Sequence, residues 1–190
     1  MPPGRLPVAP LSNVTLHSVS YRIDSSDRIV FTDDAWFEFA RQNDFENADV
    51  LGTSLWPHIT DQTTAHLYKV IIARVRTRHR PAHVTFRCDA PTVRRFMWME
   101  IAPESAGAVL FRTFTGEEHE RPRMPLLDAT VPRGKQFLKI CGWCKRIPVG
   151  AQWVEIEEAV DQLGLMLSEA LPKISHCICP ECEHQVGAEN

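Results

Sequence analysis

Cys141-Gly-Trp-Cys144 and His176-Cys-Ile-Cys179-Pro-Glu-Cys182 together hold five of the six cysteines of this chain. They form two Cys-x2-Cys pairs with 34 residues between them. In such a pair a tight turn directs two sulfurs at one point, and backbone N–H groups of the turn can hydrogen-bond the thiolates. Four sulfur ligands with no open coordination position are typical of structural zinc. We therefore predict one structural Zn²⁺, bound by Cys141, Cys144, Cys179 and Cys182.

Other uses of the cysteines stay open. A disulfide framework is the main alternative, although the first 30 residues contain no apolar run that would form a signal peptide. An iron–sulfur cluster is a further one. His176 or Cys177 could replace one sulfur, since a Cys₃His set also binds zinc. His176 next to Cys177 could also activate that thiol, which keeps a redox switch among the hypotheses.

The composition is that of a soluble globular protein. Hydrophobic residues make up 44% and charged residues 24%, and no stretch approaches the ~20 apolar residues of a membrane span. The net charge is −3, and residues 137–190 carry four Lys and Arg against eight Asp and Glu. A nucleic-acid-binding finger needs the opposite sign. Reduced cysteines and the missing targeting signal predict a cytoplasmic protein.

Hydrophobic patterning predicts an α+β fold. Residues 1–14 form a proline-rich tail, and a helix over 61–78 with apolar Leu67, Val70, Ile71 and Val75 ends before Pro81. A shorter helix covers 35–40. Residues 116–136, with three prolines, are expected to be a linker. The expected strands are 15–23, 28–31, 83–88, 94–101 and 108–114. This order suits a five-stranded antiparallel sheet with helices on one face.

Three segments within residues 15–115 resemble the PAS sensor-domain family. They are Ile29-Val-Phe-Thr-Asp-Asp-Ala-Trp-Phe-Glu-Phe-Ala40, Val50-Leu-Gly-Thr-Ser-Leu-Trp56, and Arg87-Cys-Asp-Ala-Pro91 followed by Arg94-Arg95-Phe96-Met97. Residues 137–190 are similar to a short cysteine module that follows PAS domains in bacterial sensory proteins. The resemblance implies a PAS-like domain over 15–115, a linker over 116–136 and a zinc-binding module over 137–190.

A PAS-like fold implies a ligand pocket between the sheet and the helices. An apolar or aromatic small molecule suits its composition. Haem PAS domains use a histidine on the long helix, so His66 is the candidate haem ligand, although an ordinary histidine is the plainer interpretation. A photoactive flavin would need a reactive cysteine in an Asn-Cys-Arg-Phe-type helix, which this sequence lacks. The expected lining residues are Trp36, His66, Val70, Phe86, Trp98 and Phe111.

Two groups of residues leave alternatives open. Strand 94–101 is apolar on both faces, with Phe96 and Trp98 on one and Met97 and Met99 on the other. One face should line the pocket, and the other should contact a second copy or the tail. Around the turn after Arg87, Asp89 either pairs with a neighbouring arginine or belongs to a site where arginines bind an anion.

No catalytic signature is present, neither a Gly-rich phosphate loop nor a G-x-S-x-G or kinase pattern. We therefore expect a non-enzymatic cytoplasmic signalling protein that binds a small ligand or a partner protein, and that forms a homodimer. The alternatives are a zinc-dependent nucleic-acid-binding or transcription accessory factor, and a cysteine redox switch. The module should need its metal to fold, while the PAS-like part should stay folded without it.

Overall fold

The computed structural model describes residues 18–42, 49–59, 62–167 and 170–188. The predicted tail over residues 1–14 lies outside the described residues.

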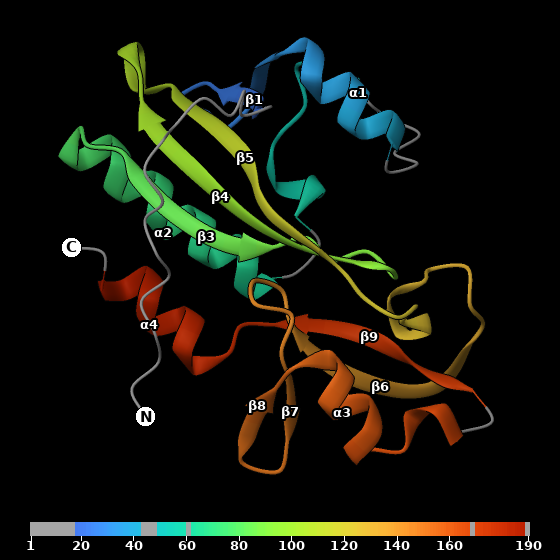
Figure 1. Cartoon of the computed structure of the whole chain (residues 1–190). Coiled ribbons are helices and arrows are strands. Elements are labelled where there is room, and N and C mark those ends of the chain that lie inside the picture. The colour runs from blue at the N-terminus through green and yellow to red at the C-terminus, as the bar shows by residue number, and fades with distance from the viewer. Residues whose placement is uncertain (1–17, 43–48, 60–61, 168–169, 189–190) are drawn as a thin grey trace.

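A five-stranded antiparallel sheet forms the first part of the chain (Figure 1). Its strands are β1 (Ser18–Ile23), β2 (Ile29–Thr32), β3 (Ala82–Arg87), β4 (Val93–Pro103) and β5 (Val109–Glu120), in the order β2-β1-β5-β4-β3. The β1–β2 turn is closed by Asp24, whose carboxylate accepts the backbone N–H groups of Ser26 and Arg28 at 2.8 and 3.0 Å. The predicted strands and their antiparallel pairing are thus confirmed.

Two helices pack on the inner face of this sheet. Asp33 begins α1 (Asp34–Gln42) by accepting the N–H of Trp36 at 3.0 Å, as an N-cap does. The longer α2 (Gln62–Arg78) buries Leu67, Ile71, Ile72 and Val75. These side chains meet the inward residues Val84, Met99, Ile101, Val109 and Phe111 of the sheet. The fold of this part is therefore α+β and PAS-like.

The C-terminal part is built around two small sheets. Strands β6 (Arg133–Cys141) and β9 (Leu171–Cys177) are parallel, and β7 (Ile147–Val149) and β8 (Gln152–Val154) form a hairpin. The helices are α3 (Ile156–Gln162) and α4 (Pro180–Ala188), with a 3₁₀ turn over Leu165–Leu167. Ile140, Ile147, Val154 and Ile156 are the centre of its apolar cluster.

Residues 116–136, where a linker is expected, contain regular structure. Strand β5 continues to Glu120, and a 3₁₀ helix covers Pro125–Leu127. Leu126 is fully buried in the C-terminal apolar cluster. Pro125 begins this 3₁₀ helix, and Leu127 packs against the same cluster.

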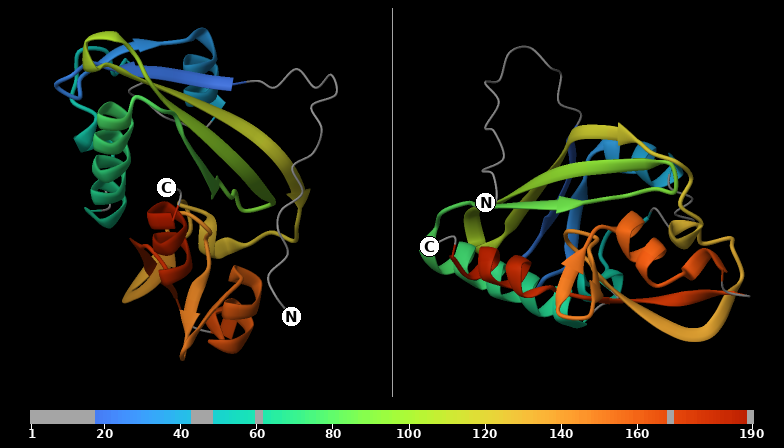
Figure 2. Two further views of the ribbon diagram at one scale, coloured as in Figure 1. Left: turned by 90° about the vertical axis from the view of Figure 1, so that its left-hand side faces the viewer. Right: turned by 60° about the horizontal axis from the view of Figure 1, so that its bottom comes forward.

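The two parts share one core instead of meeting only through a linker. Trp143, Cys141, Cys179 and Cys182 belong to the same buried cluster as α2 and the inner sheet face. The N–H of Arg87, at the end of β3, donates to the carbonyl oxygen of Trp143 at 2.7 Å. In Figure 2 the C-terminal part lies against the helix-bearing side of the sheet.

Candidate metal centre

Each Cys-x2-Cys pair lies in a turn that follows a strand. Cys141 ends β6, and the N–H of Lys145 returns to its carbonyl oxygen at 3.0 Å. Lys145 adopts a left-handed φ of 62°, and its ammonium donates to the carbonyl of Gly142 at 2.8 Å. Cys179 follows β9, and Cys182 lies in the first turn of α4. Two turns from distant segments thus present their sulfurs to one another.

The four sulfurs of Cys141, Cys144, Cys179 and Cys182 lie within 4.8 Å of one another. The Sγ atoms of Cys144 and Cys179 are 3.7 Å apart. A tetrahedral zinc site with Zn–S bonds of about 2.3 Å has sulfur–sulfur edges of about 3.8 Å. Backbone N–H groups of Cys179 and Cys182 approach the sulfurs of Cys141 and Cys179, both at 3.4 Å. The group could therefore hold a metal ion, and these N–H groups would stabilise bound thiolates.

Burial and mutual hydrogen bonding set the proton affinities of this group. Hydrogen bonds from the thiols of Cys144 and Cys182 lower the pKa of Cys141. Donation to Cys141 raises the pKa of Cys144 to about 12, and it also raises the pKa of Cys182. A divalent cation bound by the four sulfurs would favour their thiolate forms, because metal binding releases the protons of its ligands.

The two spare donors lie outside the four-sulfur group. His176 is exposed, and the thiol of Cys177 approaches the carbonyl oxygen of Ile140 at 3.6 Å. Cys88 is half-buried and also lies elsewhere. The structure therefore brings together the set of four sulfurs that the spacing favoured.

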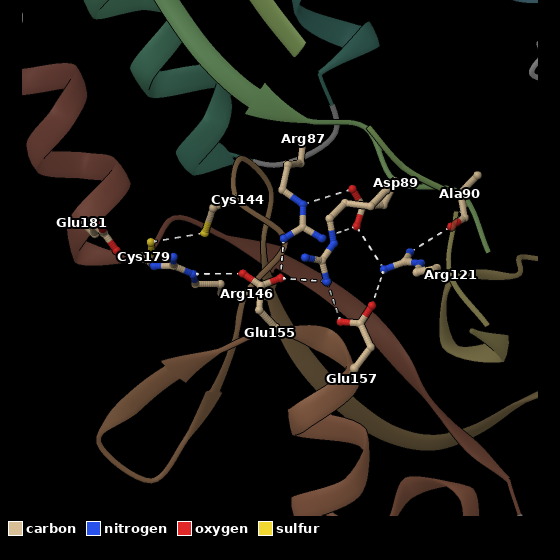
Figure 3. A network of polar contacts seen from close by, with 11 residues as sticks. Arg87, Asp89, Ala90, Arg121, Cys144, Arg146, Glu155, Glu157, Cys179 and Glu181 are labelled. Carbon is tan, nitrogen blue, oxygen red and sulfur yellow. Dashed lines mark hydrogen bonds and ion pairs between the residues drawn. The ribbon is translucent and has the colours of Figure 1, made fainter. Parts of the chain in front are cut away.

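A network of ion pairs joins the four-cysteine group to the sheet (Figure 3). Arg146 lies two residues after Cys144 and pairs with Glu181 of the second turn at 2.6 Å and with Glu155 at 3.3 Å. Glu155 also pairs with Arg87 at 2.5 Å and with Arg94 at 3.5 Å. One carboxylate thus bridges the first cysteine turn and the end of the sheet.

The network continues to a buried carboxylate at the sheet end. The side chain of Asp89 is fully buried and pairs with Arg87 and, at 3.2 Å, with Arg121. Arg121 and Arg94 each reach Glu157 at the start of α3, at 3.2 and 3.0 Å. Although burial opposes it, the backbone N–H of Glu157 and these two arginines lower the pKa of Glu157. Asp89 is thus paired with arginines, as one of the two interpretations of this turn required.

Most of the ion pairs between the sheet end and the C-terminal part could not be predicted from the sequence. Glu155, Glu157 and Arg121 meet the sheet end from 31 to 68 residues away along the chain. No local pattern marks such partners. The one sequence signal for these ion pairs is opposite charge, since arginines are frequent in residues 87–95 and carboxylates in residues 155–158.

Three of the six expected pocket residues face the interior. Phe111 is fully buried, and Phe86 and Trp36 pack against the same core. The rings form a row through it: Trp36 meets Tyr21 at 5.8 Å, Tyr21 stacks on Phe111 at 4.5 Å, Phe111 lies 6.3 Å from Tyr68, and Tyr68 meets Trp143 edge-on at 6.4 Å. This row crosses the PAS-like interior and ends between the cysteines of the first turn.

The other three expected pocket residues face away from the interior. His66 is exposed and Val70 is 37% exposed, because both lie outside the buried stripe of α2 that Leu67, Ile71 and Val75 form. Trp98 lies on the outer sheet face, where it stacks on Phe114 at 3.9 Å. Met97 and Met99 are the buried face of β4. The inward placement expected for His66, Val70 and Trp98 is therefore wrong, and with it the geometry for a haem ligand on α2.

Comparison with known proteins adds little to this picture. No family model and no curated protein matches the sequence. Among solved structures, a fungal LOV domain photoreceptor is similar at 16% identity and a TM-score of 0.32, over 62% of this chain and 83% of that chain. The fold assignment rests on the strand order and not on this likeness. Within the described residues, no helix is both long and apolar enough to cross a membrane.

Proposed function

We propose that this chain is a cytoplasmic signalling protein without catalytic activity. Its PAS-like part receives a small ligand or a partner, and surface contacts with other proteins carry the signal onward. A structural zinc ion on Cys141, Cys144, Cys179 and Cys182 holds the C-terminal part against the sheet. The observation that carries this proposal is the common core of the four-sulfur group, α2 and the inner sheet face.

A common core makes the two parts thermodynamically dependent on each other. The row of rings from Trp36 to Trp143 and the ion pairs around Glu155 both end at the first cysteine turn. A ligand that displaces Tyr68 or Phe111 would therefore change the packing of Trp143. Such differential packing is what a sensor needs, because a ligand shifts an equilibrium only through contacts that differ between two states.

Metal analysis combined with an absorbance spectrum of the purified protein tests the zinc assignment. We expect one zinc per chain and no visible band. Replacement of Cys179 by Ser should remove the metal, whereas Cys88→Ser, which alters a cysteine outside the group, should keep it. A folded protein without metal, or an iron, haem or flavin spectrum, would overturn the assignment.

An apolar or aromatic small molecule is the ligand class that the interior favours. Burial raises the pKa of Tyr68 to about 12, and its hydroxyl donates to the sulfur of Met99 at 3.9 Å. The interior beside α2 therefore offers aromatic surface with a few hydroxyl groups. Native mass spectrometry would detect a co-purifying molecule. A mass of protein plus zinc alone, with no binder in a thermal-shift screen of small aromatics, would leave only the partner-binding form of the proposal.

The outer sheet face is the surface that we assign to homodimer formation. Trp98 and Phe114 stack there, and Phe96 meets His119 edge-on at 5.7 Å. Apolar side chains on an outward face favour a protein contact. Light scattering coupled to size exclusion should report a dimer that Trp98→Glu converts to a monomer. A monomeric wild-type protein at high concentration would refute this assignment.

A redox switch is the second candidate function. Cys177 and Cys141 are directly paired across the β6–β9 ladder, so a fifth thiol lies beside the metal centre. In this alternative, peroxide would oxidise the cysteines to disulfides with release of zinc. Mass spectrometry after mild peroxide treatment separates the two functions. Unchanged thiols with retained zinc would remove the redox switch.

A further inference from the structure

The parallel pair β6–β9 has a charge that contrasts with the rest of the chain. Its two strands carry Arg133, Lys135, Lys139 and Lys173 and no Asp or Glu, in a protein of net charge −3. The lysines are all exposed. Arg133 is engaged internally, since its guanidinium donates to the carbonyls of Leu126 and Asp128 at 2.9 and 2.7 Å. Three lysines therefore give this ribbon a positive surface.

An aromatic side chain lies in the middle of that surface. Phe137 is 70% exposed, and the ammonium of Lys173 lies 5.9 Å from the centre of its ring. Phe137 and Lys139 share one face of β6 because successive side chains of a strand alternate, and Lys135 is exposed two residues before Phe137. A large exposed apolar side chain bordered by charges is a common feature of protein contact sites.

The ribbon also has a free backbone edge. Within the described residues β6 pairs in a sheet with β9 alone, and Lys135, Gln136 and Phe137 are exposed in succession. The β6–β9 register is interrupted between Arg133 and Phe137, so residues 134–136 have no ladder partner on β9. This half of β6 can therefore accept an added strand.

We propose that the β6 edge is a docking site for an extended acidic segment of a partner protein, which adds as a strand beside Phe137. This identifies the chemistry of a partner and therefore rests on the proposed signalling function. Lysines along an edge repel a second copy of the same basic strand. The same lysines attract carboxylates, and Phe137 supplies an apolar contact for one side chain of the segment.

A strand-adding peptide fits this edge better than a nucleic acid does. Nucleic-acid binding uses cations distributed along a phosphate backbone and takes no advantage of an open strand edge. Three lysines within one short ribbon are a small footprint for that purpose. Main-chain hydrogen bonds with an acidic strand use both the edge and the charge.

The test is fluorescence anisotropy of the zinc-loaded full chain with a labelled short peptide in which Glu and Val alternate. The double variant Lys135→Glu/Lys139→Glu should weaken binding about tenfold or more, and Phe137→Ala should weaken it severalfold. Added salt should also weaken it, because exposed charges are screened. The matched control is Arg78→Glu/Arg80→Glu, which reverses two exposed charges at the end of α2 and should leave binding unchanged.

Two further probes decide the mode of binding. The same peptide with alternate N-methylated amides presents no donors on one edge and should lose its affinity. Equal binding of that peptide, no binding of the parent peptide, or tighter binding of an oligothymidine would each overturn the proposal. Zinc content and hydrogen exchange of every variant are measured in parallel. Failure of the peptide with zinc and sheet protection intact would refute the docking site and leave the proposed function standing.

Discussion

Replacement of Trp143 by alanine tests whether the cysteine turns and the sheet form one cooperative unit. Trp143 lies between two cysteines in sequence, yet its side chain is only 7% exposed and packs in the core of the PAS-like part. The substitution keeps all four sulfurs and the backbone carbonyl that accepts the N–H of Arg87. It therefore removes the packing contact and leaves the metal ligands in place.

The expected loss in the free energy of unfolding is large. Truncation of a buried tryptophan to alanine costs about 3–5 kcal/mol, which includes the edge-on contact with Tyr68. Domains have total stabilities of about 5–15 kcal/mol, so this is a substantial fraction. With an m-value of about 2 kcal/mol/M, the urea midpoint should fall by about 1.5–2.5 M.

Hydrogen exchange locates the effect on the sheet. Amides of Met99, Ile101 and Phe111, on the inner strands β4 and β5, should exchange only through global unfolding. In Trp143→Ala their exchange should accelerate by roughly two to three and a half orders of magnitude, which is the same free energy expressed as a rate. Phe137→Ala is the matched control, because this 70% exposed aromatic should alter stability by less than about 0.5 kcal/mol.

Unchanged protection of Met99, Ile101 and Phe111 in a variant that retains zinc would refute the common core. The sheet would then fold without the cysteine turns, as the sequence alone suggested. Lost zinc in the variant would show that Trp143 supports the turn geometry, and chelation of the wild-type protein would then provide the matched comparison.

Three further outcomes are expected. Asp89→Asn removes the charge of the buried partner of two arginines and should lower the free energy of unfolding in urea by about 3–5 kcal/mol. The control Arg95→Ala breaks an exposed pair and should lower it by less than about 1 kcal/mol, so equal losses in the two variants would contradict the burial argument. The folded-state pKa of Glu157 is lowered, so the ionised carboxylate stabilises the fold above the unfolded pKa of about 4.3, and this stabilisation is lost as pH falls through the lower folded pKa. Glu157→Gln should therefore reduce the pH dependence of stability below pH ~4.3. An acid-unfolding profile equal to that of the wild type would contradict this prediction. His66→Ala should leave both the absorbance spectrum and the unfolding free energy within about 0.5 kcal/mol of wild type, and a visible band lost with His66 would revive the haem hypothesis.

The four-sulfur group was predictable because its signal is local chemistry. Two Cys-x2-Cys turns need only come together, and metal-ligand chemistry leaves few other uses for them. The strands were predictable for a similar reason, since alternation over residues 83–88 and 108–114 reports one buried face. Each Cys-x2-Cys turn and each alternating strand is a signal carried by a few consecutive residues of the chain.

The sequence predicted less well which face of a strand or helix is buried. Strand β4 is apolar on both faces, so its sequence does not distinguish the buried Met97 and Met99 from Trp98 on the outside. On α2, Val70 borders the apolar stripe, and Ile72 rather than Val70 completes it in the structure. Neighbouring elements decide such faces, and a single strand or helix does not encode its neighbours.

The docking of the C-terminal part was the least predictable feature. A short, cysteine-rich segment normally owes its stability to its metal, and that rule suggested an independent module. In the sequence Trp143 is a single aromatic residue inside a cysteine turn, and its neighbours along the chain do not predict the contact with Tyr68. Long-range packing of this kind follows only from the assembled sheet and α2.

Internal pairing also changes what the net charge of residues 137–190 implies. Glu155 and Glu157 are neutralised by Arg87, Arg94 and Arg121 of the sheet end, so they contribute little negative potential to the surface. The exposed lysines of β6 and β9 have no such internal carboxylates within their own strands. A count of charges along the chain therefore understates how basic this ribbon is to a partner. Competition between an acidic peptide and an oligothymidine on the β6 edge is consequently a sharper test of partner class than the overall charge.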